Sequence, residues 1–164
     1  MNIVLIGFMG SGKTTIGRKL AVRLGYRFVD MDRFIEEEQQ CKIAQIFEER
    51  GEATFRSLET GLLKRLKKAE NTVVSTGGGV VTIEGNIEII RSIGISIYLK
   101  AGIDNIFERV SRNNKRPLLQ TDNPLQTIKD MMEKREGAYS QADLILETNS
   151  LSMGNVVSKI IQSL

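Results

Sequence analysis

The sequence predicts an α/β fold in which a five-stranded parallel sheet is flanked by helices on both faces. Three observations lead to this prediction. Short apolar segments alternate with stretches of helical periodicity, a glycine-rich segment joins the first strand to the first helix, and the length of 164 residues suits one full core. Strands that alternate with helices form parallel sheets. We therefore expect one domain over residues 1–164, built as a three-layer sandwich.

The predicted strands are short and apolar. They lie at residues 2–6, 26–29, 72–75, 95–99 and 144–146. The first helix is predicted over residues 15–24, where Ile16, Leu20 and Leu24 recur at helical spacing. In open sheets of this type, ligand sites gather at the carboxyl ends of the strands. The residues that follow the strands are therefore the candidate site residues.

The segment that follows the first strand, residues 7–14, fits the pattern G-x-x-x-x-G-K-[ST]. Its glycines let successive backbone N–H groups point at one anion, and the helix that begins there adds its positive dipole end. Lys13 would reach the β- and γ-phosphates of a nucleotide, and the Thr14 hydroxyl would bind Mg²⁺. A turn without a ligand would explain neither side chain. The pattern therefore predicts a phosphate-binding loop.

Asp30 and Asp32 follow the second strand. If the strand geometry continues, side chains two residues apart point to the same side, so both could face the phosphates. One would act on the Mg²⁺ shell and the other would accept a hydrogen bond from the attacking hydroxyl. Alternatively, Asp32 caps the helix that begins at Arg33. The two roles are compatible.

Three glycines, residues 77–79, follow the third strand. A run of glycines lets backbone N–H groups approach a ligand closely, at an entropic cost that a plain turn would not require. We therefore favour a binding loop.

A long helix is predicted to begin at Gly51, with an apolar face made of Phe55, Leu58, Leu62, Leu63 and Leu66. Arg56 and Glu59 stand three apart on this helix and can pair. Spacing alone predicts a surface ion pair.

Composition excludes several classes of function. The net charge of +3 and the pI of about 9.1 fit anionic small molecules but are too weak and dispersed to predict nucleic acid as a partner. With Cys41 alone and no histidine, we expect neither an intrachain disulfide nor a thiol or imidazole catalyst. No apolar run approaches the roughly 18 residues of a membrane span, and no targeting signal is visible. We expect a cytoplasmic protein without membrane contact.

Residues 111–116 are basic and polar, and Pro117 and Pro124 follow. This composition predicts a loop between two helices. It can be interpreted as a solvated loop or as a lid over residues 111–124 that closes on the site and excludes water.

Together these segments resemble the shikimate kinase family. The motifs, in order, are residues 7–14, Asp30-x-Asp32, Ile46-Phe47, Gly51-Glu52-x-x-Phe55-Arg56, residues 77–79 and Arg116-Pro117-Leu118-Leu119. The resemblance covers essentially the whole chain. It implies a P-loop, nucleoside-monophosphate-kinase-like fold with a short lid. It also implies transfer of the γ-phosphoryl group of ATP to the 3-hydroxyl of shikimate, on the route to chorismate and the aromatic amino acids.

The resemblance assigns roles to individual residues. The nucleotide side comprises Gly10, Ser11, Gly12, Lys13, Thr14 and Thr15, with Arg109 against the adenine and Arg116 from the lid on the phosphates. Mg²⁺ falls to Thr14 and Asp30, directly or through water. The acceptor side, with a helical region over about residues 32–60, comprises Asp32 as candidate base, Arg56 and Arg135 on the carboxylate, and Gly78 and Gly79 on the ring. Lys13, Asp32 and Arg116 form the implied catalytic set.

Two alternatives stay open at this stage. A related kinase acting on gluconate or a nucleoside monophosphate would share the loop and the fold, and a nucleotide-binding switch or silent kinase-like module would share the loop without the reaction. One departure from the family is Gln40, which stands where the family often carries glycine, so the local turn is expected to differ. The resemblance also suggests a monomer.

Overall fold

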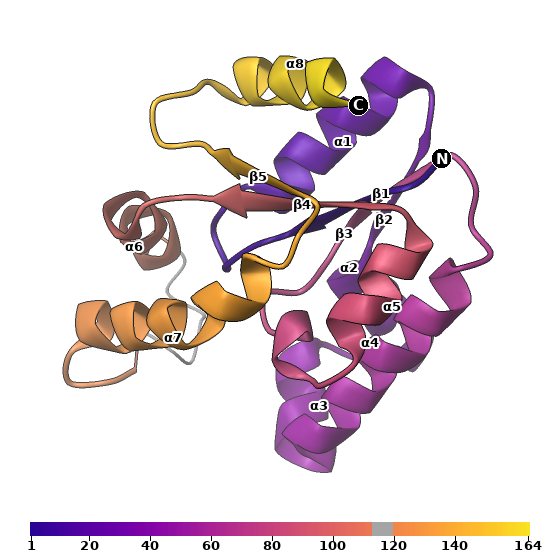
Figure 1. Cartoon of the computed structure of the whole chain (residues 1–164). Coiled ribbons are helices and arrows are strands. Elements are labelled where there is room, and N and C mark those ends of the chain that lie inside the picture. The colour runs from indigo at the N-terminus through magenta and orange to yellow at the C-terminus, as the bar shows by residue number, and fades with distance from the viewer. Residues whose placement is uncertain (113–119) are drawn as a thin grey trace.

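The computed structural model describes residues 1–112 and 120–164 of the chain. Five parallel strands form one sheet in the order β2-β3-β1-β4-β5 (Figure 1). Their bounds are β1 Ile3–Ile6, β2 Arg27–Asp30, β3 Thr72–Ser75, β4 Ile95–Lys100 and β5 Leu144–Glu147. Every strand lies within one residue of its predicted range. The predicted α/β fold with a five-stranded parallel sheet is confirmed.

Helices alternate with the strands along the chain. Their bounds are α1 Lys13–Leu24, α2 Met31–Gln39, α3 Ile43–Arg50, α4 Glu52–Leu66, the short 3₁₀ helix η1 Val80–Thr82, α5 Asn86–Ile93, α6 Ile103–Ser111, α7 Pro124–Tyr139 and α8 Met153–Ser163. In Figure 1, α1 and α8 pack together on one face of the sheet, and α4 and α5 lie on the other. Among the described helices, none combines the length and the apolar character that crossing a bilayer requires.

Helices cover both faces of the sheet, and alternate residues of β1 point to opposite faces. Ile3 and Leu5 join a core cluster with residues of α1 and α8. Val4 and Ile6 join a second cluster with residues of α4, α5 and α7. All four side chains of this strand are fully buried. The continuous apolar run in the sequence thus marks a central strand.

The strand order brings the loops that carry the site together. β1 lies between β3 and β4, and β3 lies beside β2. Beyond the end of β3, both the backbone N–H and the hydroxyl of Thr76 donate hydrogen bonds to the Leu5 carbonyl, at 3.2 and 2.9 Å. The loops that follow β1, β2 and β3 therefore emerge side by side at one edge of the sheet.

Candidate active site

The loop after β1 has the geometry of an anion cradle. Gly12, at the start of α1, has a φ of 94°, a left-handed conformation that favours glycine. The Lys13 ammonium folds back over the loop and donates to the carbonyls of Gly7 and Phe8, at 2.7 and 2.9 Å. Both Ser11 and Lys13 are buried. The loop thus holds a positive charge beside the first turn of α1, where the helix dipole also favours anions.

Asp30 links this loop to the end of β2. The Thr14 hydroxyl donates to Asp30 Oδ2 at 2.8 Å, and Asp30 Oδ1 accepts from the backbone N–H of Arg33 at 3.3 Å. Asp30 is therefore the residue that caps α2. These two oxygen-bearing side chains suit Mg²⁺, which binds one or two carboxylates together with phosphates and water.

The alternative in which Asp32 caps this helix is wrong. The strand does not continue past Asp30, because α2 already begins at Met31. Asp32 therefore lies inside the first turn of α2. It still faces the phosphate loop, but through helix geometry and not through the strand alternation that the spacing suggested.

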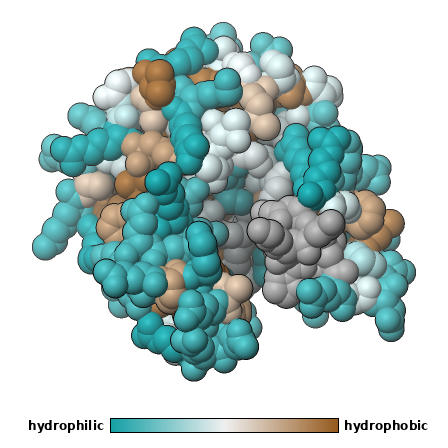
Figure 2. All heavy atoms as spheres, turned by 180° about the vertical axis from the view of Figure 1, so that it is seen from behind, coloured by the Kyte–Doolittle hydropathy of each residue, from teal (hydrophilic) through white to brown (hydrophobic). Residues whose placement is uncertain are grey.

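A cavity of about 380 Å³ opens between these elements. It is lined by eight of the predicted site residues, namely Gly10, Gly12, Lys13, Thr14, Thr15, Asp30, Asp32 and Gly78. The face shown in Figure 2 is mainly hydrophilic and is hollowed near its centre. The cavity lining combines loop backbone with the ammonium group of Lys13, the guanidinium of Arg33 and the carboxyl groups of Asp30, Asp32 and Glu36. This mixture suits a phosphate ester next to a hydroxylated acceptor.

Two buried carboxyl groups meet beside Gly77. A methyl group added at Gly77 would lie 2.5 Å from Glu59 Oε1 and 2.9 Å from Asp32 Oδ1. The two oxygens thus lie within about 6 Å of each other, a range in which like charges raise one another's pKa. Burial is the main cause that raises the pKa of Glu59 to about 6, against the opposing effect of Arg56. Burial, followed by the charge of Asp30, also raises the pKa of Asp32.

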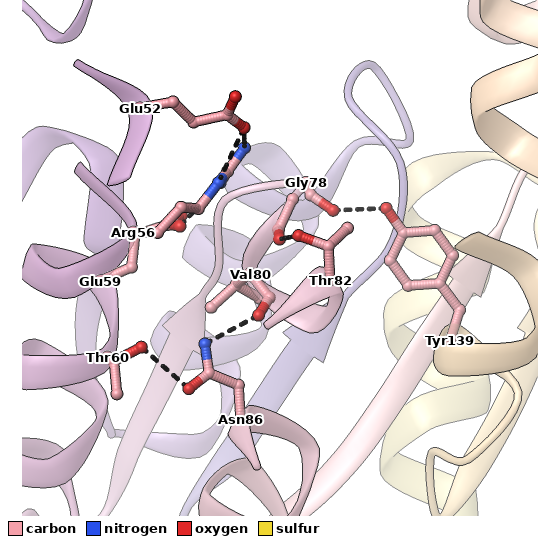
Figure 3. A network of polar contacts seen from close by, with 10 residues as sticks. Glu52, Arg56, Glu59, Thr60, Gly78, Val80, Thr82, Asn86 and Tyr139 are labelled. Atoms are coloured by element: carbon pink, nitrogen blue, oxygen red, sulfur yellow. Dashed lines mark hydrogen bonds and ion pairs between the residues drawn. The ribbon is translucent and has the colours of Figure 1, made fainter. Parts of the chain in front are cut away.

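Arg56 is held by two glutamates of its own helix. Its Nη1 donates to Glu59 Oε2 at 2.7 Å, and its Nη2 donates to Glu52 Oε1 at 3.3 Å (Figure 3). The prediction that Arg56 and Glu59 pair is confirmed, but the prediction that the pair lies on the surface is wrong, because Glu59 is completely buried. The guanidinium lies against the backbone of Gly79, where an added methyl group would come within 3 Å of Nη1, Nη2 and Cζ.

Arg135 reaches the same glycine loop from the other side. It projects from α7, and its Cζ lies 5.5 Å from the centroid of the Phe8 ring. Its Nη1 would lie 3.7 Å from a methyl group added at Gly78. Arg56 and Arg135 thus flank residues 77–79, although each lines a groove next to the phosphate cavity and not the cavity itself.

Of the remaining predicted arginines, the structure places Arg109 beside the loop after β1. Arg109, on α6, donates from Nη1 to the Gly10 carbonyl at 2.9 Å, which places it directly against the phosphate loop. Arg116 lies outside the described residues, as does most of the first half of the predicted lid.

Comparisons with known proteins agree with this geometry. A family model described as shikimate kinase matches residues 9–164. The chain belongs to the shikimate kinase family. As a member of this family, it is an ATP-dependent phosphotransferase.

Individual shikimate kinases match over almost their whole length. One from Thermodesulfovibrio yellowstonii is 41% identical over 161 residues, which cover 98% of this chain and 93% of that protein. The solved structure of a shikimate kinase from Acinetobacter baumannii in complex with shikimate has a TM-score of 0.94 and 40% identity, covering 99% of this chain and 91% of that chain. A gluconokinase from Sinorhizobium meliloti has a TM-score of 0.62 at 14% identity, so it shares the fold alone.

In this shikimate kinase family member, Tyr139 is a residue that the sequence analysis missed. Its hydroxyl donates to the carbonyl of Gly78 (Figure 3). Its ring is buried and stacked on Tyr98 at a centroid distance of 5.0 Å. The Tyr98 hydroxyl in turn donates to Glu136 at 2.7 Å. This chain of contacts fixes the glycine loop from behind. Its only sequence signal is that Tyr139 lies one helical turn after Arg135.

Proposed function

We propose that this site transfers the γ-phosphoryl group of ATP to the 3-hydroxyl of shikimate, which gives shikimate 3-phosphate and ADP. The observation that carries the proposal is one cavity lined by the phosphate-binding Lys13 and Thr14 and by the carboxyl group of Asp32. A phosphoryl donor and a hydroxyl acceptor bound there would meet in one cavity. Alignment and charge neutralisation are the main requirements of this reaction.

On the donor side, we assign the phosphates to Lys13 and to the backbone N–H groups of residues 10–15, with Arg109 toward the adenine. Thr14 and Asp30 would hold Mg²⁺, which neutralises charge on the phosphates when bound. Arg116 is assigned to the phosphates from the sequence alone, as part of a lid over residues 111–124. Together these positive groups would stabilise the charge that spreads over the transferred phosphoryl group.

On the acceptor side, we assign the hydroxyl to Asp32. Asp32 lines the cavity, so its carboxyl group can accept a hydrogen bond from a substrate hydroxyl that is bound there. A raised pKa brings the carboxylate closer to the strength that a general base needs. Because the transition state is loose, positioning the hydroxyl matters more than early removal of its proton.

Arg56 and Arg135 are assigned to the carboxylate of the acceptor, with Gly78 and Gly79 on its ring. A planar guanidinium fork binds a carboxylate through two parallel hydrogen bonds, which an ammonium group cannot reproduce. Residues 32–60 would then form the acceptor-binding region of a single domain over residues 1–164. We expect the enzyme to be a cytoplasmic monomer, as the family suggests.

The test is ADP release with ATP and Mg²⁺, using shikimate, gluconate and a panel of nucleoside monophosphates as acceptors. We expect turnover with shikimate alone, and a loss of about 10²- to 10⁴-fold in Asp32→Asn, the range typical of a lost acid–base group. Asp130→Asn, which removes an exposed carboxylate on α7, is the matched control. Turnover with a different acceptor would contradict the assignment of the acceptor pocket.

A further inference from the structure

The guanidinium of Arg56 has three edges, and each one faces a different group. Nη1 donates to Oε2 of Glu59, and the end that carries Nη1 and Nη2 lies against the backbone of Gly79. The remaining edge, Nε and Nη2, donates to the single oxygen Oε1 of Glu52 at 3.4 and 3.3 Å. The parallel pair of N–H groups that suits a carboxylate is therefore already in use.

Of these three contacts, only the one to Glu52 can be given up easily. Glu59 is fully buried and Gly79 is backbone, whereas 66% of the Glu52 side chain is exposed. The two bonds to Glu52 are also at or beyond the long end of the usual range. The contact with Glu59 is shorter, at 2.7 Å. An incoming carboxylate would therefore replace Glu52.

Glu52 also stands where such a carboxylate would arrive. It lines one groove with Arg56, Thr60 and Lys64, and it lines a neighbouring groove with Arg135. It is thus the carboxylate that borders the grooves of both arginines assigned to the acceptor. Figure 3 shows Glu52 reaching back over Arg56, on the side away from Glu59.

We infer that Glu52 is an internal competitor of the acceptor. In the absence of acceptor, its carboxylate occupies the Nε–Nη2 edge of Arg56, and the acceptor carboxylate must displace it before it can bind there. This inference rests on the proposed role of Arg56. Once displaced, Glu52 loses little, because it is the first residue of α4 and its negative charge remains favourable at the helix N-terminus.

The competing model is that Glu52 positions Arg56 for the acceptor, as a supporting partner would. The two models predict opposite effects when the charge of Glu52 is removed. A competitor that is removed strengthens acceptor binding, whereas a supporting partner that is removed weakens it. Partly exposed ion pairs four residues apart are weak, so the effect will be modest in either direction.

The experiment is isothermal titration calorimetry of the full chain with shikimate, and separately with ATP and Mg²⁺. We expect Glu52→Gln to lower the Kd for shikimate about two- to fivefold and to leave the Kd for the nucleotide unchanged. The neutral amide of shikimate should gain nothing, because it brings no carboxylate. Glu48→Gln, which removes an exposed charge from the neighbouring α3, is the matched control and should behave as wild type.

An unchanged or increased Kd for shikimate in Glu52→Gln would overturn the inference. The proposed function would remain intact in that case, provided that wild type binds and phosphorylates shikimate. An equal gain in Glu48→Gln would also overturn it, because general charge and not the contact with Arg56 would then be responsible. If wild type neither binds nor phosphorylates shikimate, the proposed function fails and this inference fails with it.

Discussion

The carboxyl group of Glu59 has an unusually high pKa because of its surroundings in the site. Its own burial and the charge of Asp32 oppose ionisation of the carboxyl group, whereas Arg56 and Arg135 favour it. Burial has the largest effect, so the pKa rises from its ordinary value of 4.5 to about 6. The folded state therefore binds a proton on Glu59 more tightly than the unfolded state does.

A raised carboxyl pKa makes a protein less stable as the pH increases. Between about pH 4.5 and 6, the unfolded chain releases this proton before the folded one does, so the contribution of Glu59 is fully present below pH 4.5 and is lost as the pH rises through 6. The free energy of unfolding of wild type should therefore fall relative to Glu59→Gln by about 2 kcal/mol between about pH 3.5 and pH 7. Urea unfolding of both proteins at several pH values measures the difference. A constant difference across the window would contradict the raised pKa.

The second prediction at the residue scale concerns Gly79, whose φ of −91° would admit alanine. A methyl group there would push against the Arg56 guanidinium, and we expect Gly79→Ala to raise the Kd for shikimate about tenfold, equal to about 1.4 kcal/mol of lost contact. The Kd for ATP should change less than twofold. Gly61→Ala, whose methyl group meets nothing within 4 Å, is the control. Similar losses for both ligands would show that the substitution disturbs the fold.

At this scale, the sequence predicted the residues of the phosphate loop because their roles follow from a local pattern. Lys13, Thr14, Asp30 and Asp32 follow two strands, and parallel strands bring their ends together. The burial of Glu59 and the bond from Tyr139 to Gly78 depend on segments that are far apart in the chain. Helical spacing places Glu59 on the apolar face, four residues after Phe55 and three before Leu62, whereas the spacing of Arg56 and Glu59 taken alone predicts a surface pair.

At the scale of elements, the end of α2 shows how a non-glycine residue terminates a helix. Gln40 has φ and ψ of 53° and 35°, the left-handed conformation that glycine favours, and its N–H donates to the Glu36 carbonyl. Gln40 thus closes the turn in a backbone conformation that glycine adopts readily but that is unfavourable for a residue with a side chain.

We therefore predict that Gln40→Gly stabilises the protein. Relief of the left-handed conformation is worth about 1–2 kcal/mol, offset by about 0.4–1 kcal/mol from the greater freedom of glycine in the unfolded state. The net gain should be about 0.5–1 kcal/mol, measured by urea unfolding. Gln39→Gly, at the last residue of the helix, should instead destabilise the protein by up to about 1 kcal/mol. If both variants lose stability, the conformation of Gln40 is not strained.

The elements themselves were largely predictable. Each strand combines apolar residues with a glycine, an aspartate or a helical pattern that ends it, so its bounds follow from local chemistry. The start of α2 was predicted two residues too late, at Arg33 and not at Met31, because both Asp30 and Asp32 are good caps and the spacing alone does not choose between them. In the structure Asp30 is the cap, and it also accepts a hydrogen bond from Thr14 on α1.

At the scale of the whole molecule, binding of either ligand should stabilise the fold, because the site is formed by loops from three strands. At a concentration of 100 times its Kd, shikimate alone should add about 2.7 kcal/mol to the free energy of unfolding. For a chain of this size, this corresponds to a rise in Tm of roughly 5–10 °C. Gluconate at the same concentration is the control. Stabilisation by ATP but not by shikimate would instead support a nucleotide-binding module without an acceptor.

The order of the strands in the sheet brings the loops of the site together. The sequence predicted that the sheet is parallel, but it did not predict which strands are neighbours. β3 inserts between β2 and β1, so that the glycine loop faces the phosphate loop. That arrangement depends on long-range pairing, such as the contact of Thr76 with Leu5, which leaves no local pattern in the chain.

The stacked tyrosines behind Gly78 give the protein an internal optical probe. The chain contains no tryptophan and three tyrosines, so its intrinsic fluorescence comes from tyrosine, and two of the three emitters are in contact. The hydroxyl of one of them is bonded to the backbone of the glycine loop. A ligand that shifts this loop alters the hydrogen bond of the emitter itself, so occupancy of the acceptor pocket can be followed in the unlabelled protein by its own emission.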